Sequence, residues 1–355
     1  MPAYFARCLR GLEDICEAEL AAIEGLEVKG KGIRTLFFEY KGPAAKLISL
    51  RSLDDVFIHL GSLSGMNHTR AMLAEIPDRL QLLLENLPEQ IEIVRTCRLL
   101  SPAPSYSLTI GLQGKKNFSR FELQDKLLPL FQSKLKGVYF PNEKGSEGGE
   151  LDFRISLEGN QLELGIRLGE KPLHRREYKL HSRPGSTKAP LAYIMAYLAR
   201  IKPDNLVLDP CCGVGTILIE ASKAFPEARY EGVDIQEEAV VYAKANSEVA
   251  ESKSKFQQGD LRNLPYGDGS VDRIVSNPPW GRQVASHIEL GSFYREMYQE
   301  WKRLLTAKGI LVILTDQEES MRSLLSSEET FQEIETYELS LFGSVVKLYL
   351  WQKLV

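Results

Sequence analysis

The sequence lacks the features of membrane and secreted proteins. None of its apolar runs approaches the roughly 18–20 residues that a bilayer-spanning helix needs. The N-terminal residues contain no long apolar stretch behind a basic start, so we expect no secretory signal peptide. The cytoplasm is therefore the compartment that we expect for this chain.

Patterns typical of structural metal sites are also missing. The 5 cysteines form no Cys-x-x-Cys pair, and the 5 histidines show no matching spacing, so we expect no zinc site and no other metal. An odd number of cysteines in a cytosolic protein indicates reduced thiols. Cys211 and Cys212 are adjacent, and we expect them in a tight turn that requires small side chains.

Neither an internal repeat nor a low-complexity tract is present. A hydrophobic content of 43% and a charged content of 26% are ordinary for globular protein, and 355 residues suit two or three domains. The net charge of −4 conceals a basic stretch, because residues 171–188 hold six basic side chains against Glu177 alone. Clustered positive charge is typical of phosphate contact. A solvated linker is the alternative interpretation.

The first half of the chain predicts two small units that mix helices and strands. Residues 1–60 form the first unit, and residues 61–168 form the second. Glu158-Gly159-Asn160 indicates a hairpin turn between two strands of the second unit. The expected strands are residues 5–9, 35–40, 91–99, 106–112, 152–157 and 161–168. The expected helices are residues 12–23, 44–50, 80–87 and 122–135.

From residue 190 the pattern changes to helices that alternate with strands. Residues 169–189, which are charged and have no apolar period, read as a basic linker in front of this domain of residues 190–355. Alternation of this kind predicts a doubly wound, mostly parallel α/β sheet. Residues 331–339 and 345–353 read as two terminal strands without a helix between them. Such an antiparallel hairpin is typical of the methyltransferases that use S-adenosylmethionine (AdoMet).

A glycine loop follows the first strand of this domain. Asp209-Pro-Cys-Cys-Gly213-Val-Gly215 lies between a predicted strand at 206–209 and a predicted helix at 216–224. Glycines allow the backbone to approach a ligand closely. A dinucleotide is the alternative ligand, but Leu218 stands where the third glycine of Gly-x-Gly-x-x-Gly would be. An acidic residue at position 209 also suits the cationic ammonium and sulfonium groups of AdoMet better than a pyrophosphate.

Two further aspartates follow the next strands. Asp234 ends the predicted strand at 230–234, where a carboxylate can accept both ribose hydroxyls. Asp260 can accept the adenine amino group, and Leu261 can donate its backbone N–H. A turn or a helix cap is the alternative role for any one of these aspartates. Three of them at the expected strand ends favour the cofactor site.

Asn277-Pro278-Pro279-Trp280 follows the predicted strand at 273–276. The Asn277 side-chain oxygen and the Pro278 carbonyl offer two acceptors to an exocyclic amino group. Hydrogen bonds to both amino protons would aim the nitrogen lone pair at the methyl group, and the transfer would be governed by positioning. Trp280 offers a flat face on which an extruded base can stack. A proline-rich turn with a core tryptophan is the alternative.

These residues resemble motifs I and IV of class I AdoMet-dependent amino-methyltransferases. Residues 173–178, Leu-His-Arg-Arg-Glu-Tyr, resemble the junction at which a THUMP domain joins such an enzyme, and residues 7–20 are similar to the start of its ferredoxin-like domain. Asn277-Pro-Pro-Trp-Gly281 is similar to the Asn-Pro-Pro-Tyr-Gly of the THUMP-containing RNA guanine-N2 methyltransferases. Trp280 and Lys179 depart from the more usual Tyr or Phe and from Arg, respectively.

The resemblance implies a ferredoxin-like domain at 1–60, a THUMP domain at 61–168 and a Rossmann-like methyltransferase domain at 190–355 with a seven-stranded sheet. It implies methylation of guanine N2 in tRNA, with guanine 6 of the acceptor stem as the target and S-adenosylhomocysteine as the second product. The expected catalytic residues are Asn277, Pro278 and Trp280. The expected cofactor-binding residues are Asp209, Cys211, Gly213, Gly215, Thr216, Asp234, Ile235, Asp260, Leu261 and Asn277. The expected phosphate contacts are Lys115, Lys116, Arg120, Arg175 and Arg176.

Other acceptors use the same kind of turn. Ribosomal RNA guanine N2 and nucleic-acid adenine N6 stay open, whereas the basic 171–188 segment disfavours the glutamine amide of a protein. A non-enzymatic RNA-binding protein with a decayed methyltransferase fold is the alternative from another class. Intact Gly213, Gly215, Asp234 and Asn277 argue against decay. We expect a monomer that needs no obligate protein partner.

Overall fold

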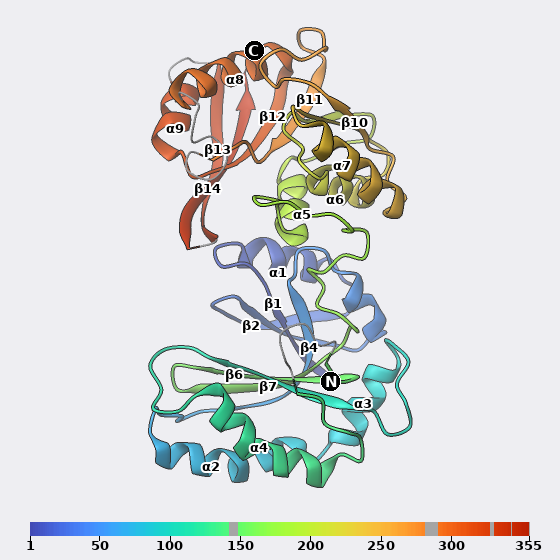
Figure 1. Ribbon diagram of the computed structural model, residues 1–355, viewed down its shortest axis with the longest axis vertical. Coiled ribbons are helices and arrows are strands. Elements are labelled where there is room, and N and C mark those ends of the chain that lie inside the picture. The colour runs from blue at the N-terminus through green and yellow to red at the C-terminus, as the bar shows by residue number, and fades with distance from the viewer. Residues whose placement is uncertain (142–147, 281–289, 327–329, 342, 355) are drawn as a thin grey trace. The chain divides into compact units, whose positions relative to one another are not determined.

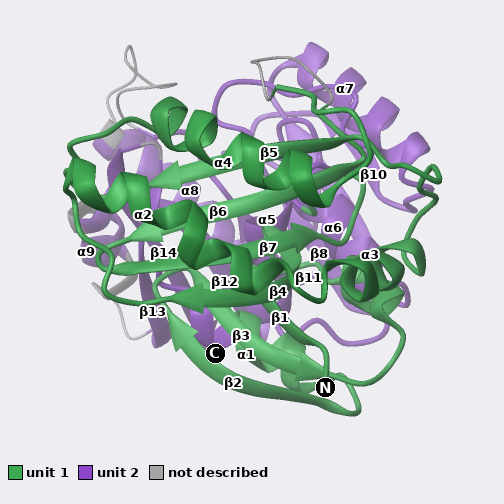
Figure 2. Cartoon of the chain, turned by 90° about the horizontal axis from the view of Figure 1, so that it is seen from below, with its two compact units in different colours: residues 1–8, 16–173 green, residues 9–15, 174–355 purple. Residues whose placement is uncertain are grey.

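The computed structural model describes all 355 residues except 142–147, 281–289, 327–329, 342 and 355. The chain forms two compact units, which Figure 2 shows in different colours. Unit 1 contains residues 1–8 and 16–173, and unit 2 contains residues 9–15 and 174–355. None of the described helices is both long and apolar enough to cross a membrane.

Unit 1 is built on one mixed seven-stranded sheet in the order β2-β3-β1-β4-β7-β6-β5. Helices α2 and α4 lie side by side along β6 and β7 (Figure 1). Only β5 and β6 pair in parallel, because α4 and the following loop form the crossover between them. Its strands are β1 (Ala3–Arg7), β2 (Leu26–Gly32), β3 (Thr35–Tyr40), β4 (Asp55–Leu63), β5 (Tyr106–Leu112), β6 (Leu151–Glu158) and β7 (Gln161–Arg167). Its helices are α1 (Glu13–Ala21), η1 (Ala44–Ser49), α2 (Arg70–Gln81), η2 (Leu82–Leu84), α3 (Leu87–Arg95) and α4 (Arg120–Lys134).

The structure of unit 1 tests the hairpin, strand and boundary predictions made for residues 1–168. The hairpin prediction is confirmed, since Glu158 pairs with Gln161 and Gly159 adopts a positive φ of 56°. The strand predicted at 91–99 is wrong, because Leu87 and Val94 are buried on one face of helix α3 instead. The expected boundary after residue 60 falls inside β4, and the sheet continues across it. The names of the two N-terminal domains therefore stay a prediction.

Unit 2 confirms the predicted α/β class with a mostly parallel seven-stranded sheet. The strand order is β10-β9-β8-β11-β12-β14-β13, and only the pairs made by β14 are antiparallel. Its strands are β8 (Leu206–Asp209), β9 (Arg229–Asp234), β10 (Lys255–Gln258), β11 (Val271–Ser276), β12 (Leu305–Thr315), β13 (Phe331–Leu341) and β14 (Ser344–Lys353). Its helices are α5 (Ala189–Leu198), α6 (Thr216–Ala224), α7 (Glu237–Val249), α8 (Leu290–Leu304) and α9 (Glu318–Ser326).

The core of unit 2 places the strand ends that matter for function. Aromatic residues of α8, among them Tyr294, Tyr298 and Trp301, pack with Met321 of α9 against one face of the sheet. Helices α6 and α7 pack against β8, β9 and β10. The parallel strands β10, β9, β8 and β11 therefore present their carboxyl ends at one edge, where ligands bind in open α/β sheets.

Candidate active site

Asp209 ends β8 with its carboxyl group almost completely enclosed, at an exposed fraction of 1%. Its Oδ1 accepts hydrogen bonds from Ser276 Oγ at 2.9 Å and from the backbone N–H of Cys211 at 3.3 Å. Burial raises the pKa of Asp209 to about 7, although both hydrogen bonds act in the opposite direction. A cation bound beside this carboxyl group would favour its ionised form.

The two glycines of the loop play different structural parts. Gly213 has a positive φ of 52°, and a Cβ atom added there would meet nothing within 4 Å. Gly215 has a φ of 82°, and its added Cβ would lie 2.8 Å from the Phe256 ring. Gly215 therefore permits close packing of α6, whereas Gly213 leaves open space beside the backbone into which a ligand can fit.

Asp234 ends β9 and holds the glycine loop. Its Oδ2 accepts the backbone N–H of Gly213 at 2.9 Å, and its Oδ1 accepts that of Gln236 at 3.0 Å. An ionised carboxylate has about four lone-pair sites, so acceptor capacity remains for two ribose hydroxyls. The adjacent Ile235 side chain has an exposed fraction of 60% and offers apolar surface beside that carboxylate.

Asp260 follows β10 and forms an ion pair with Arg262. The guanidinium Nε lies 2.9 Å from Oδ1 and its terminal nitrogen lies 2.6 Å from Oδ2, which lowers the pKa of Asp260. The carboxylate is therefore ionised and keeps acceptor capacity for an amino group. The next side chain, Leu261, is buried.

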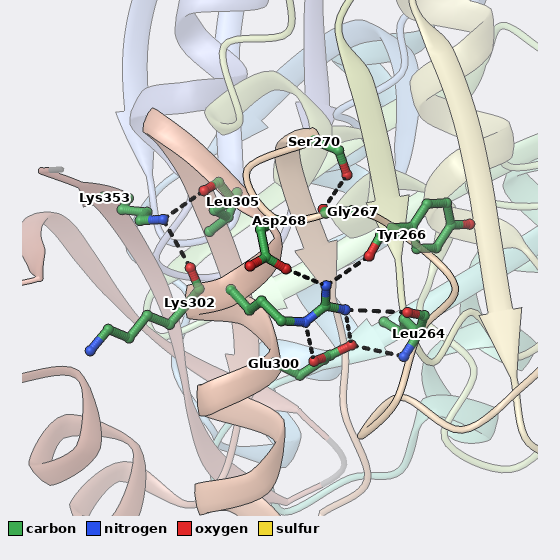
Figure 3. A network of polar contacts seen from close by, with 10 residues as sticks. Leu264, Tyr266, Gly267, Asp268, Ser270, Glu300, Lys302, Leu305 and Lys353 are labelled. Atoms are coloured by element: carbon green, nitrogen blue, oxygen red, sulfur yellow. Dashed lines mark hydrogen bonds and ion pairs between the residues drawn. The ribbon is translucent and has the colours of Figure 1, made fainter.

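The loop that follows Asp260 is fixed to α8 by Arg303. Its partners Leu264, Tyr266, Asp268 and Glu300 are labelled in Figure 3. Its guanidinium donates to the Asp268 carboxylate at 2.8 Å and to the backbone carbonyls of Leu264 and Tyr266. Glu300 pairs with Arg303 at 2.6 Å and accepts the backbone N–H of Leu264 at 2.8 Å. The adenine side of the expected site is thus supported by a fully bonded polar network.

Two smaller side chains belong to the glycine loop and to the start of the helix that follows it. Cys211 Sγ lies 2.9 Å from Ser276 Oγ, and burial raises the pKa of its thiol well above the ordinary value. Thr216 begins α6, and its buried hydroxyl has no hydrogen-bond partner among the described residues. The cofactor half therefore contains a neutral thiol and one hydroxyl that a ligand can engage.

Asn277 follows β11, and its amide orientation is defined by two neighbours. Its Nδ2 donates to the Gly185 carbonyl at 3.1 Å and lies 3.2 Å from Thr187 Oγ1. A backbone carbonyl only accepts hydrogen bonds, so the amide nitrogen has to face Gly185. The opposite atom, Oδ1, is buried and has no partner among the residues that the structure describes.

The rest of the turn is anchored to the domain. Pro278 is buried, and the Pro279 carbonyl accepts a hydrogen bond from Tyr294 Oη at 2.7 Å. Trp280 has an exposed fraction of only 8%, and its Nε1 donates to the Leu314 carbonyl at 3.3 Å. Stacking of a base on this indole stays a prediction. Gly281 lies outside the described residues.

The expected phosphate contacts divide into two groups. Lys115, Arg120 and Arg175 are exposed, and the Arg120 guanidinium lies 4.8 Å from the centre of the Phe121 ring. Lys116 donates to the Gly159 carbonyl at 2.8 Å.

Arg176 differs from this group. Its Nε lies 3.1 Å from Oε1 of Glu220, a carboxylate with no exposed surface. The structure therefore assigns Arg176 a partner inside unit 2.

Sequence reasoning missed the contribution of residues 176–187, which it read as a linker. The carboxylate of Glu220 accepts a hydrogen bond from Tyr178 Oη at 2.8 Å. The side-chain amide of Asn246 accepts a hydrogen bond from the backbone N–H of His181 and donates one to its carbonyl, both at 3.0 Å. Whether Asn246 and Glu220 are buried depends on tertiary packing, which the local sequence pattern does not predict. The Pro184-Gly185 pair was a readable turn signal.

The residues present fit AdoMet. Open space beside Gly213, the carboxylates of Asp209 and Asp234 and the exposed Ile235 side chain match a ligand with a cationic amino-acid part, a ribose and a base. Among the described residues, no group of three or more His, Cys, Asp or Glu side chains could hold a metal ion.

Comparison with known proteins agrees with this geometry. Residues 176–345 match the family model of the RMKL-like methyltransferase domain, UPF0020. Over 170 residues the chain is 34% identical to a Bos taurus protein named U6 snRNA (guanine-N(2))-methyltransferase THUMPD2, covering 47% of this chain and 32% of that one. It is 33% identical over 165 residues to the Thermus thermophilus tRNA (guanine(6)-N2)-methyltransferase, covering 46% of this chain and 49% of that one.

The matched region spans about a third of the length of the first of these relatives and about half of the second. The crystal structure of TrmN from Thermus thermophilus matches 100% of both chains with a TM-score of 0.79 at 23% identity, which shows a shared fold. A methyltransferase-type sheet, the glycine loop between two carboxylates and the family match agree. Residues 176–345 therefore resemble an RMKL-like methyltransferase domain and have a methyltransferase fold.

Proposed function

We propose that this chain transfers a methyl group from AdoMet to the exocyclic N2 of a guanine in tRNA, with guanine 6 of the acceptor stem as the target. The observation that carries the proposal is the buried Oδ1 of Asn277, which has no hydrogen-bond partner among the described residues and follows the strand that pairs with β8. Native structures seldom leave a buried carbonyl oxygen without a donor. A substrate amino group would supply that donor.

The cofactor-binding role falls to residues at three strand ends and in the glycine loop. Asp209 faces the cationic amino-acid part, Asp234 accepts the ribose hydroxyls, and Asp260 with Leu261 receives the adenine. Gly213, Gly215, Cys211, Thr216 and Ile235 complete the set. When bound, AdoMet supplies an electrophilic methyl group on a sulfonium and leaves as S-adenosylhomocysteine.

The acceptor role falls to the Asn277 oxygen and the Pro278 carbonyl. Each accepts a hydrogen bond from one N–H of the guanine N2 amino group, which turns the nitrogen lone pair toward the methyl carbon. A bound AdoMet would supply the methyl group to this nitrogen, with the S–C bond breaking as the N–C bond forms, and the surplus N2 proton would pass to solvent. Alignment of this kind lowers the entropic part of the barrier to a displacement reaction.

RNA capture is assigned to unit 1 and to the exposed basic residues. Lys115, Lys116, Arg120 and Arg175 are the proposed phosphate contacts, and all of these except the half-buried Lys116 are exposed. The ferredoxin-like and THUMP domains proposed for residues 1–60 and 61–168 would supply this surface. We propose a cytoplasmic monomer.

Transfer of labelled methyl from AdoMet to purified total tRNA tests the proposal, with nucleoside analysis of the product. N2-methylguanosine is expected, and mapping should place it at position 6. Label in U6 snRNA or ribosomal RNA instead would keep the methyltransferase and change its substrate. N6-methyladenosine would overturn the guanine assignment. AdoMet binding without transfer to any RNA would favour a non-enzymatic RNA-binding protein.

A further inference from the structure

Residues 176–187, here called the positioning segment, run across helices α6 and α7 to reach Asn277. Arg176 and Tyr178 bond to the buried Glu220 of α6. The buried Asn246 of α7 bonds the backbone of His181 and also donates to the Val214 carbonyl at 3.1 Å. The segment is thereby fixed to the same helices that carry the cofactor loop.

Near its C-terminal end, the positioning segment forms a tight turn at Arg183-Pro184-Gly185-Ser186. The backbone N–H of Ser186 donates to the Arg183 carbonyl at 3.0 Å, and Ser186 Oγ accepts the backbone N–H of Arg183 at 2.9 Å. Proline at the second position and a third-position glycine with a φ of 79° are typical of a type II turn. This geometry fixes the direction of the Gly185 carbonyl, which accepts a hydrogen bond from Nδ2 of the Asn277 amide.

Thr187 adds the second contact. Its side chain has an exposed fraction of 8%, and its backbone carbonyl accepts Lys179 Nζ at 2.8 Å. Its Oγ1 lies 3.2 Å from Asn277 Nδ2. Both hydrogens of the Asn277 amide therefore have acceptors on the positioning segment, and a rotation of the amide by 180° would place Oδ1 against the Gly185 carbonyl.

We propose that Thr187 and the Gly185 carbonyl are positioning groups that hold the Asn277 amide with its oxygen directed toward the acceptor amine. The proposal rests on the proposed function for the identity of that amine. The proposal extends the proposed function because the positioning segment lies outside the glycine loop and the Asn277–Trp280 turn. The segment would nevertheless help to select a substrate that donates a hydrogen bond. An acceptor-only substrate atom would face an oxygen and be rejected.

The test compares Thr187→Val with Thr187→Ser and with the control Thr336→Val. Thr336 lies on β13, where its hydroxyl bonds only to the surface carboxylate of Glu333 among the contacts described. For Thr187→Val we expect kcat on tRNA to fall about five-fold, the size of one uncharged hydrogen bond, with the Kd of AdoMet changed less than two-fold. Thr187→Ser should restore kcat, and Thr336→Val should match the parent.

A second readout does not depend on activity. In a protein labelled with ¹⁵N at asparagine, the side-chain amide signals of Asn277, identified by their loss in Asn277→Ala, should shift in Thr187→Val but not in Thr336→Val. Unchanged kcat and unchanged signals would overturn the positioning role. A loss of AdoMet affinity equal to the loss of kcat would also overturn it and place Thr187 in the cofactor site. If the parent methylates no RNA, the proposed function fails while the amide signals still decide the geometry.

Discussion

In the cofactor half of the site, the carboxylates of Asp209 and Asp234 accept backbone N–H groups of the very loop that they face. In the acceptor half, Asn277 donates both amide hydrogens to the positioning segment, but its Oδ1 has no donor among the described residues. The cofactor half is therefore held in shape by its own bonds. The acceptor half is held equally firmly, yet it leaves one acceptor open for a substrate.

Asn277→Ala should have the largest effect, because it should impair the acceptor half of the site and leave the cofactor half intact. The variant removes the open oxygen without touching Asp209 or Asp234, so we expect kcat to fall at least about 100-fold while the Kd of AdoMet changes by less than about three-fold. Methyl transfer to tRNA and calorimetric titration with AdoMet measure the two quantities. An equal loss of both would make Asn277 a structural residue of the whole site.

Gly215→Ala should damage the cofactor half instead. The added Cβ would lie 2.8 Å from Phe256 at a φ of 82°, so Phe256 or α6 has to move. We expect AdoMet affinity to fall at least about ten-fold and the free energy of unfolding to drop by about 2 kcal/mol. Gly267→Ala is the matched control, because its Cβ would meet nothing within 4 Å. Intact AdoMet binding in Gly215→Ala would show that this glycine does not shape the site.

The pH dependence of AdoMet binding should belong to the cofactor half alone. Because burial raises the pKa of Asp209 to about 7, its protonated form is favoured in the free protein below that pH. A bound cation favours the ionised form, so binding releases a proton and affinity should rise about ten-fold between pH 6 and pH 8. Asp209→Asn should bind more weakly and show a flat profile between these pH values. A rising profile in that variant would assign the titration to another group.

The same linkage has a consequence for stability without ligand. A carboxyl group with a raised pKa in the folded state binds its proton more tightly there than in the unfolded chain. The free energy of unfolding should therefore decrease as the pH rises from about 4 to about 7, and Asp209→Asn should remove this contribution. Thermal denaturation of the free protein across that range measures it.

Tyr294→Phe should give the smallest effect and sharpen the contrast within the acceptor half. Its hydroxyl bonds to the Pro279 carbonyl, which supports the turn but is not the proposed substrate contact. We expect the free energy of unfolding to drop by about 1 kcal/mol and kcat to fall less than about three-fold. A loss of kcat as large as that of Asn277→Ala would move the substrate contact toward Pro279.

The parts of the site that follow from strand ends could be predicted from the sequence. Asp209 and Asp234 end β8 and β9 as expected, and the positive φ of Gly213 follows from the tight turn that a strand–loop–helix junction requires. Register in a parallel sheet brings such residues to one edge whatever the distant contacts are. The terminal hairpin of β13 and β14 was predictable from another local signal, because two strand patterns follow each other there, joined near Gly343 with no helix between them.

The partners of buried side chains could not be predicted in this way. Arg176 carries a charge that reads as exposed, but Glu220, 44 residues further along, pairs with it inside the domain. The sequence left open whether Trp280 stacks on a base or lies in the core, and it could not predict that this side chain is buried and donates to the Leu314 carbonyl. Such contacts depend on which helix covers which strand end, and that is decided by packing across the whole domain rather than by local spacing.

The pairing order of unit 2 also constrains the order in which this domain can form during synthesis. β8 lies between β9 and β11, and the Asp209 carboxylate accepts its bond from Ser276, 67 residues later in the chain. At a synthesis rate of about 5–20 residues per second, β11 emerges roughly 3–13 s after β8. During that interval the nascent chain has its glycine loop but lacks β11, the strand that carries the Ser276 donor to Asp209. Affinity for AdoMet should therefore appear late on the ribosome and in a single step, when β11 inserts.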